Sequence, residues 1–575
     1  MSEFYHDVVI VGAGPTGLLS AILAHARGLD VCVVEYKSRG GISGHAHFLN
    51  AYSLRILHSV GIDLEFLYSQ STPMQQSHRM AYCTSLSNVF ASVDLQEQSS
   101  FVSTWHALGL YGGSMNVPFH ILYQSLLNLC IKLKVNIHWE CSLSILSSNT
   151  ENVSFRLDYS DSTRIGSSQW LLACDGSHSG IARSLGIDYT NKNAWQSFLS
   201  VEVIGSIREF CTHEAMLYWI YHPQVQACMV AHDLDHYQVL QIPVEVEDGK
   251  SPFSHADLNN FLSLICGRLD KASIPEIGKV CLWHMQSHLL EKMQCDRVLF
   301  LGDCVHAMTP AGGMGMNAGL ADAFNLIWKL ASTCKTKSSV YIDSFSRERL
   351  PVVANQVQMS VENYRDFLAL PKLLGIKQGQ VSIFRQSYRY LHSLEFSNTY
   401  LDTLQSMFTS APQLFLHPKY GFRFLQESVD KALEGNAKHF QGLEQHVDFT
   451  YVSDLIHEPY QGHLPFFLSH TQFLSGRLLP FVIMQDKSSL DKYLQYRKWI
   501  VVLGSKQSIW RDLFLKHLDA CELLTQDINY YPKDSHFRIG TSSCLIIRPD
   551  GIVALMQTSL SDKPFFTRLF SLWFQ

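Results

Sequence analysis

The sequence lacks a run of apolar residues long enough to cross a membrane. A spanning helix needs roughly 18 consecutive apolar residues, and the longest candidate, residues 8–24, is interrupted by three glycines and a proline. The same stretch lacks the basic start and the cleavage site of a secretory signal. We therefore expect no membrane span and a cytoplasmic location.

Basic residues are not in excess. The formal net charge of the chain is −6 at pH 7, whereas a nucleic-acid groove needs a basic face. We therefore expect no nucleic-acid partner.

The sequence has 14 scattered cysteines but no C-x-x-C. In a long chain without a secretory signal, such cysteines are expected to be buried thiols rather than disulfides. Among the 27 histidines, only His45/His47 and His232/His236 suggest metal-binding pairs, and neither pair falls in a known ligand motif. We therefore expect no metal site.

A glycine loop near the N-terminus lies between a strand and a helix. The strand is predicted over Asp7–Val11 and the helix over Leu18–Arg27; a second strand, Asp30–Val34, ends at Glu35. The G-x-G-x-x-G pattern in this context indicates dinucleotide binding, because its glycines let a pyrophosphate approach the helix start. The loop consists of Gly12, Ala13, Gly14, Pro15, Thr16 and Gly17.

A second strand–loop–helix unit follows much later in the chain. A strand over Val298–Leu301 ends at Gly302 and Asp303, and a helix is predicted over Asn317–Ala331. The carboxylate can accept hydrogens from ligand hydroxyls, while the helix start offers free N–H groups to negative charge. An ordinary strand–helix connection is the alternative interpretation. The loop and helix start contribute Pro310, Gly313, Gly315, Met316 and Asn317 as candidate ligand contacts.

A third unit has the same plan. A strand over Leu171–Cys174 ends at Asp175 and a glycine, and Arg183 follows in the next predicted helix. Either this unit contributes to the ligand site, or it is a simple strand–helix turn with a structural Arg183.

These three stretches resemble the motifs of the FAD-dependent aromatic hydroxylases, the single-component phenol-hydroxylase-like monooxygenases. The resemblance implies that Glu35 binds ribose hydroxyls and that the first glycine loop binds the ADP part of FAD. It also implies that Asp303 holds the ribityl chain, and that the start of the helix at Gly315–Asn317 lines the pyrimidine side of the isoalloxazine. Asp175 and Arg183 would organise the region of the pyrophosphate and the path of the nicotinamide.

The chain departs from the family at the loop that passes the flavin. His47 stands where phenol hydroxylases carry an aspartate near the substrate hydroxyl, so it is a candidate base for deprotonating a phenol. A histidine that only bonds the loop backbone is the equal alternative. His45 replaces a more usual basic residue, and Phe119 replaces a glutamine that touches the flavin.

The expected fold class is α/β, with three components. They are a Rossmann-type FAD-binding domain, an interleaved antiparallel-sheet substrate domain, and a C-terminal thioredoxin-like α/β domain. The last rests on a hairpin around Pro549–Gly551 that resembles the closing hairpin of the larger hydroxylases. We expect the FAD-binding domain at 1–72, 113–190 and 286–410 (with a helical extension), the substrate domain at 73–112 and 191–285, a linker at 411–495, and the thioredoxin-like domain at 496–575.

The function expected from this resemblance is that of an FAD-dependent monooxygenase. It would use NADPH or NADH and O2 to hydroxylate an aromatic, phenolic or polyketide-like substrate through a flavin hydroperoxide. Two alternatives remain open: an FAD-dependent dehydrogenase or reductase that inserts no oxygen, and a non-catalytic flavin-binding partner protein. A homodimer, with the C-terminal domain as a contact, is also compatible with the family.

Overall fold

The structure is a computed structural model of the chain. It describes residues 4–42, 44, 46–94, 114–246, 252–267, 274–373, 407, 423–441, 449–461, 474–479, 498–504, 510–519, 521–525, 542–557, 560 and 562–574.

The first unit is an eight-stranded sheet made of β1 (Phe4–Val11), β2 (Val31–Val34), β7 (Asn136–His138), β8 (Ser142–Ser148), β9 (Val153–Asp158), β10 (Thr163–Ala173), β16 (Gln294–Cys295) and β17 (Val298–Phe300). Its main path runs β16-β17-β10-β1-β2-β7. The central strands β17, β10, β1 and β2 are parallel to one another. Every residue of β2 and β17 is buried, as expected for parallel strands covered on both faces.

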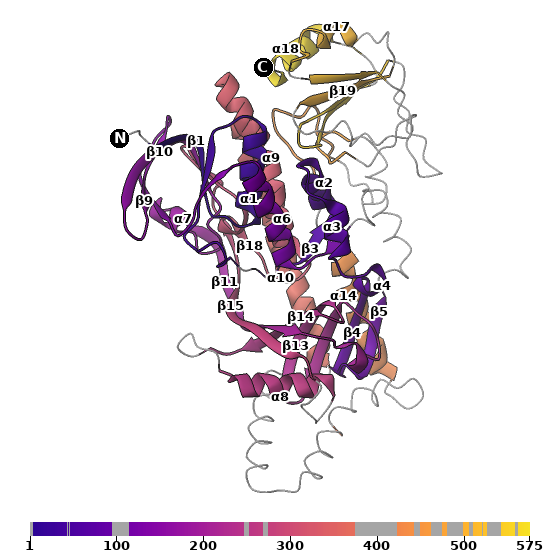
Figure 1. The fold of residues 1–575 in the computed structure, drawn as a ribbon. Coiled ribbons are helices and arrows are strands. Elements are labelled where there is room, and N and C mark those ends of the chain that lie inside the picture. Colours follow the sequence, from indigo (N-terminus) through magenta and orange to yellow (C-terminus); the bar gives the residue numbers. More distant parts are fainter. Residues whose placement is uncertain are drawn as a thin grey trace.

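Helices cover this sheet and bring distant parts of the chain together (Figure 1). The main ones are α1 (Pro15–Ala26), α6 (Phe119–Lys132) and α9 (Met314–Thr336). The crossing of α1 and α9 is close, because a Cβ on Gly319 would lie 2.4 Å from Thr16 Oγ1. Both helices begin three residues before their predicted starts: α1 at a proline, which favours the first helical position, and α9 directly after Gly313 in the left-handed conformation.

The second unit is an eight-stranded sheet made of β4 (Arg79–Ser85), β5 (Asn88–Asp94), β11 (Tyr189–Ile204), β12 (Leu217–His222), β13 (Val225–Asp233), β14 (Tyr237–Val244), β15 (Glu276–Leu290) and β18 (His306–Ala307). The strands run β18-β15-β11-β14-β13-β12-β4-β5, and all neighbours are antiparallel except β12 and β4. Helix α8 (His255–Cys266) packs on it and contributes to its core. The predicted interleaved antiparallel sheet is thus confirmed.

Short elements join the two sheets. Strands β3 (Phe48–Asn50) and β6 (Ser114–Asn116) pair with each other, and α2 (Ala51–Ser59) follows β3 directly. Asn50 caps α2 by accepting a hydrogen bond from Ser53 N–H at 2.8 Å. The remaining short elements are α3 (Leu64–Ser69), α4 (Met74–Ser77), α7 (Gly180–Ser184) and the 3-10 turns η3 (Arg208–Phe210) and η5 (Gly302–Cys304).

The C-terminal unit is a four-stranded sheet with helices. It contains β19 (Trp499–Leu503), α17 (Arg511–Phe514), β20 (Cys521–Thr525), β21 (Cys544–Ile547), β22 (Val553–Gln557) and α18 (Lys563–Trp573). The order is β20-β19-β21-β22, with β19 parallel to β20 and antiparallel to β21. The predicted hairpin is present as β21 and β22. The assignment of this unit as thioredoxin-like stays a prediction.

One helix lies where the sequence indicated a linker. Helix α14 (Arg423–Gln441) falls inside the range 411–495 and packs with α10 (Val340–Phe367) and α11 (Ala369–Leu373). Its Val429 and Leu433 join a cluster with residues of β4 and β12, and Asn436 Nδ2 donates to Tyr82 Oη at 3.1 Å. The apolar face of this helix therefore covers the substrate sheet. The mixed composition of residues 411–495 did not indicate this helix.

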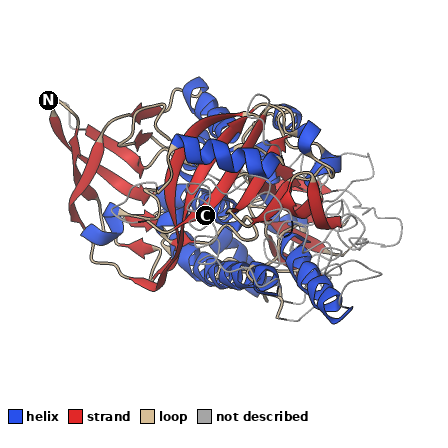
Figure 2. Ribbon diagram, turned by 90° about the horizontal axis from the view of Figure 1, so that it is seen from below, coloured by secondary structure: helices blue, strands red, loops and turns tan. Residues whose placement is uncertain are grey.

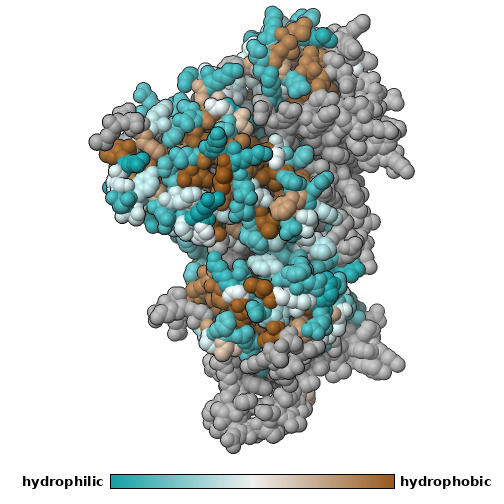
Figure 3. All heavy atoms as spheres, viewed as in Figure 1, coloured by the Kyte–Doolittle hydropathy of each residue, from teal (hydrophilic) through white to brown (hydrophobic). Residues whose placement is uncertain are grey.

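Helices and strands are mixed through the described molecule, as Figure 2 shows from below. None of the helices in this described part is long and apolar enough to cross a membrane. On the face seen in Figure 3, apolar and polar residues alternate. Strongly exposed apolar side chains, such as Tyr36 after β2 and Ile165 in β10, come from separate segments. All 14 cysteines are free thiols, as the sequence predicted.

Candidate functional site

The first glycine loop connects the carboxyl end of β1 to α1. Ala13 N–H donates to Glu35 Oε2 at 2.8 Å, and Lys37 N–H donates to Glu35 Oε1 at 2.9 Å. Strands β1 and β2 are parallel, so the loop and Glu35 lie at the same edge of the sheet. Ligands of open α/β sheets bind outside this carboxyl edge.

The three glycines of this loop differ in their surroundings. Gly12 has φ +106°, and a Cβ there would lie 2.2 Å from the Cys174 carbonyl oxygen. A Cβ on Gly17 would lie 1.9 Å from the Gly12 carbonyl oxygen. In contrast, a Cβ on Gly14 would meet nothing within 4 Å. The protein itself thus requires glycine at two of these positions, and the open space at the third fits the close approach of a ligand.

The same loop starts a helix without a side-chain cap. Gly14 is the N-cap residue of α1, and no side chain bonds to the N–H groups of the first turn. These groups point their partial positive charge outward, which suits a phosphate. The loop therefore has the free space and the uncapped N–H groups that a pyrophosphate site needs, and its binding of a pyrophosphate stays a prediction.

The second glycine loop places a carboxylate deep in the protein. Gly302 has φ +69°, and Asp303 follows it in η5. Burial among surrounding protein raises the pKa of Asp303, yet its side chain is exposed to solvent. Its Oδ1 lies 3.9 Å from where a Cβ on Gly315 would stand, at the start of α9.

The two loops meet at Thr16. A Cβ on Gly302 would lie 3.0 Å from Thr16 Oγ1, and one on Gly319 would lie 2.4 Å from the same atom and 3.2 Å from Gly302 Cα. Asp303 follows Gly302, which lies beside Thr16. Glu35 binds Ala13, in the same loop as Thr16. Both carboxylates therefore border one continuous region.

A buried ion cluster that we did not predict supports the second loop. Asp322 Oδ2 accepts from Gly302 N–H at 3.0 Å and lies 2.7 Å from His306 Nε2; its Oδ1 accepts from Arg349 Nε at 2.7 Å. Burial by itself raises the pKa of Asp322, but Arg349 and His306 outweigh it and keep that pKa low.

The loop and first turn of α9 contain both solvent-accessible residues and a buried residue that bonds neighbouring loops. Gly313, at φ +64°, is its N-cap and provides no side-chain cap. Met316 is half-buried and Pro310 is exposed. Asn317 is buried: its Oδ1 accepts from Asn50 N–H at 3.0 Å and its Nδ2 donates to Gly313 O at 2.7 Å. The side chain of Asn317 thus holds the loops together, and only its backbone is available to a flavin.

The third unit is less closely joined to the others. Asp175 follows β10, and its backbone N lies 3.3 Å from where a Cβ on Gly12 would stand. Its Oδ2 accepts from Ile181 N–H at 3.1 Å, while burial raises its pKa. Arg183 is exposed and donates to the His178 carbonyl at 3.4 Å. The structure brings Asp175 to the first glycine loop, whereas the described contacts of Arg183 stay within its own turn.

His47 lies directly before β3, and its ring contacts His232 of the substrate sheet. Its Nδ1 bonds the Asn116 side chain, so the ring does not simply bond the loop backbone. Burial lowers the pKa of His47. Its ring packs edge-on against His232 with centroids 5.2 Å apart, and His232 stacks on Tyr237 at 5.6 Å. The sequence did not indicate Asn116 or Tyr237, and it indicated His232 only as a possible metal ligand, because the three residues come from separate strands or strand ends.

Two departures from the family have different outcomes. His45 lies outside the described residues. The Phe119 ring covers the flavin-side loop, because a Cβ on Gly44 would lie 2.5 Å from its Cε2. Phe119 also stacks on Tyr123 with centroids 6.0 Å apart.

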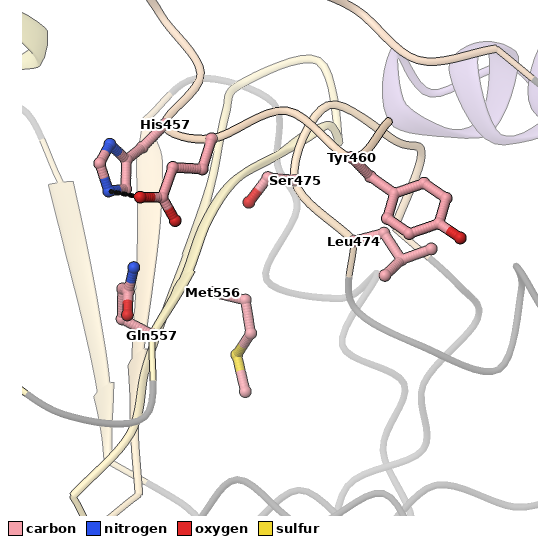
Figure 4. Close-up of a pocket in the computed structure, with 7 residues that line it drawn as sticks. His457, Tyr460, Leu474, Ser475, Met556 and Gln557 are labelled. Atoms are coloured by element: carbon pink, nitrogen blue, oxygen red, sulfur yellow. Dashed lines mark ion pairs between the residues drawn. The ribbon is translucent and has the colours of Figure 1, made fainter. Parts of the chain in front are cut away.

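The described residues include no group of three or more histidine, cysteine or acidic side chains that could hold a metal ion. His232 is buried in the aromatic cluster, while His236 is exposed and bonds Asp233. A cavity of about 200 Å³ lies elsewhere, beside the β22 end of the C-terminal unit (Figure 4). In this cavity His457 Nε2 lies 3.8 Å from Glu458 Oε1.

A second buried ion cluster joins the flavin unit to the C-terminal hairpin. Arg548 donates to both oxygens of Glu348, at 2.7 and 2.9 Å. Lys329 Nζ lies 2.7 Å from Glu348 Oε2, and Arg548 also bonds Asp550. The side chains of all four residues are fully buried. The C-terminal unit is therefore fastened to α9 and α10.

Comparisons with known proteins agree with this geometry. A family model described as FAD binding domain matches residues 5–360. The chain is 26% identical over 375 residues to the 3-(3-hydroxy-phenyl)propionate/3-hydroxycinnamic acid hydroxylase of Escherichia coli O8 (strain IAI1). That match covers 64% of this chain and 63% of the relative, so the chain spans less than two thirds of the relative's length.

Two solved structures share the fold over almost the full chain. The flavin-dependent monooxygenase PieE, in complex with FAD and substrate, has a TM-score of 0.83 at 18% identity, with 99% of each chain covered. Aklavinone-11 hydroxylase with FAD and aklavinone has a TM-score of 0.74 at 18% identity, with 100% of each chain covered. Because the family match takes in more than half of the 575 residues and includes both glycine loops, the chain belongs to the FAD binding domain family and has the fold of flavin-dependent monooxygenases.

Proposed function

We propose that this protein is an FAD-dependent monooxygenase that hydroxylates an aromatic substrate. The observation that carries the proposal is the meeting of the two glycine loops at Thr16, with the carboxylate of the exposed residue Asp303 directly after Gly302. The first glycine loop and Asp303 would suit a ligand that has a pyrophosphate at one end and hydroxyls further along.

The residues divide the task of holding FAD. The loop 12–17 and the start of α1 would bind the pyrophosphate, and Glu35 would accept hydrogen bonds from ribose hydroxyls. Asp303 would accept hydrogens from the ribityl chain. The backbone at Gly315 and Met316, at the uncapped start of α9, would stabilise negative charge on the reduced ring.

When bound, FAD supplies hydride acceptance and the transfer of one oxygen atom of O2 to a ring. The protein's own part is to orient the substrate and to keep water away from the reacting atoms. Pro310 and the adjoining loop suit the exclusion of water. His47 faces the substrate sheet and is a neutral histidine at neutral pH, since its pKa is lowered. It is therefore suited to accept a proton from a phenol.

Further parts of the proposal rest on the family. NADPH or NADH would be the hydride donor and O2 the second substrate. The aromatic hydroxylases and the two structural neighbours support an aromatic substrate, phenolic or polyketide-like. Arg183 and Asp175 would border the path of the nicotinamide. A homodimer and a cytoplasmic location complete the proposal.

The test is purification followed by a flavin spectrum and a screen of phenolic compounds for accelerated NAD(P)H oxidation. We expect a yellow protein whose NAD(P)H oxidation yields a hydroxylated product. Release of one peroxide per NAD(P)H with every compound tried would instead favour a dehydrogenase or reductase. A protein that takes up no FAD would overturn the proposal entirely.

A further inference from the structure

A short two-stranded connection fixes His47 and Asn116 beside each other. In the pairing of β3 with β6, Phe48 lies opposite Asn116. Val117 N–H donates to the His47 carbonyl at 2.7 Å. The backbone thus determines the position of both side chains, and their contact does not depend on the side chains alone.

Thr72 holds the Asn116 side chain in place. Asn116 Nδ2 donates to Thr72 Oγ1 at 2.6 Å, and Thr72 N–H donates to the Asn116 carbonyl at 2.9 Å. With its NH2 group used in this way, the amide presents Oδ1 to His47 Nδ1. An amide oxygen only accepts hydrogen bonds, so His47 Nδ1 must carry the proton. The opposite amide orientation would move that proton to Nε2, and the experiment below separates the two.

The other ring nitrogen of His47 is left accessible. Among the described residues, no hydrogen-bond partner is found for Nε2. Nε2 is also not one of the fully buried side-chain atoms that lack a partner, so solvent reaches it. In the tautomer set by Asn116, this nitrogen carries a lone pair and no hydrogen. It is therefore the only ring atom of His47 that can take up a proton.

Two of the titratable groups that face His47 from the substrate sheet, His232 and Tyr237, are uncharged. His232 on β13 has its pKa held well below the ordinary value by burial and by the nearby histidines 47 and 120, so it is neutral. Tyr237 on β14 stacks on His232, and burial raises its pKa, so its hydroxyl stays protonated. That hydroxyl donates to Glu202 Oε1 at 3.4 Å. His120 on α6 packs edge-on against Tyr237 at 5.4 Å.

We propose that Asn116 and Thr72 are positioning residues that hold the His47 imidazole in its Nδ1–H tautomer, so that Nε2 accepts the proton of the substrate's ring hydroxyl. In this step the O–H bond of the phenol breaks, its electron pair stays on the oxygen, and the proton bonds to Nε2. The resulting imidazolium keeps its Nδ1–H bond to Asn116. The inference rests on the proposed function.

The first test observes the tautomer directly and needs no substrate. The FAD-loaded protein, labelled with 15N in its histidines, gives nitrogen–proton correlations that distinguish the two tautomers, and the His47→Gln variant assigns the signal. We expect His47 to be neutral with its proton on Nδ1 at pH 7. Asn116→Leu and Thr72→Val should both disturb this state, whereas His213→Gln, an exposed histidine of the substrate domain, should not. A proton on Nε2 in the unsubstituted protein overturns the proposal.

The second test uses the phenol that the screen identifies. His47→Gln should lower kcat by roughly 10²- to 10⁴-fold, the usual contribution of a general base, with FAD affinity unchanged. Asn116→Asp places a carboxylate on Nδ1 and raises the pKa of His47, so the acidic limb of the kcat profile should move to higher pH. An unmoved limb contradicts the role of Asn116. If no phenol is hydroxylated at all, the proposed function fails, while the tautomer measurement still stands by itself.

Discussion

Replacing Gly14 by alanine tests whether its open space is reserved for a ligand. A Cβ there meets nothing within 4 Å, and the residue has the ordinary extended angles φ −67° and ψ 175°. The substitution should therefore not strain the ligand-free protein, and the loss of freedom in the unfolded chain should stabilise it by about 0.4–1 kcal/mol. In the FAD complex, however, the methyl group would stand where the pyrophosphate approaches.

The magnitude follows from the hydrogen bonds that the displaced pyrophosphate would lose. A hydrogen bond to a charged group contributes about 1.5–3 kcal/mol, so the loss of one weakens FAD binding by roughly 10- to 150-fold. The assay is a fluorescence titration of the deflavinated protein with FAD, together with its melting temperature. Gly17→Ala is the matched control, because its Cβ would lie 1.9 Å from the Gly12 carbonyl oxygen and should lower the melting temperature. An unchanged dissociation constant for the Gly14 variant would refute the reasoning.

Three further predictions concern charged side chains. Arg548→Met leaves two buried carboxylates, Glu348 and Asp550, with Lys329 as the remaining cation of this cluster, and should destabilise the protein by about 3–5 kcal/mol. Arg347→Met, which removes an exposed ion pair, should cost less than about 1 kcal/mol; chemical denaturation measures both. Asp303→Ala should abolish most FAD binding with an unchanged circular dichroism spectrum, and tight FAD binding by this variant would exclude a ribityl contact. Burial raises the pKa of Glu348, but Arg548 and a buried lysine outweigh it and hold that pKa below the ordinary 4.5. The unfolded state then binds more protons than the folded state, so stability is present above pH 4.5 and is lost as the pH falls below it. Glu348→Gln should flatten this acid dependence of the melting temperature, and an equally steep dependence would contradict the assignment.

The sequence by itself determined the local units that we propose to bind the cofactor. A strand, a glycine turn and a helix start are encoded within a few residues, so the loop 12–17 and the Gly302–Asp303 turn could be located without coordinates. Helix starts were misjudged by three residues at both α1 and α9, because a proline and a left-handed glycine extend those helices into the loops. The linker expected at 411–495 contains α14, whose short apolar stripe has meaning only against the substrate sheet.

The tertiary structure decided which of these units meet. The close crossing of α1 and α9 at Thr16 and Gly319 joins two loops that lie almost 300 residues apart in the chain. The pairing of His47 with Asn116, and the fastening of the C-terminal hairpin to Glu348, also depend on long-range contacts. Periodicity and turn residues report only on near neighbours along the chain. The positions of side chains from different strands are fixed by packing, which no local pattern records.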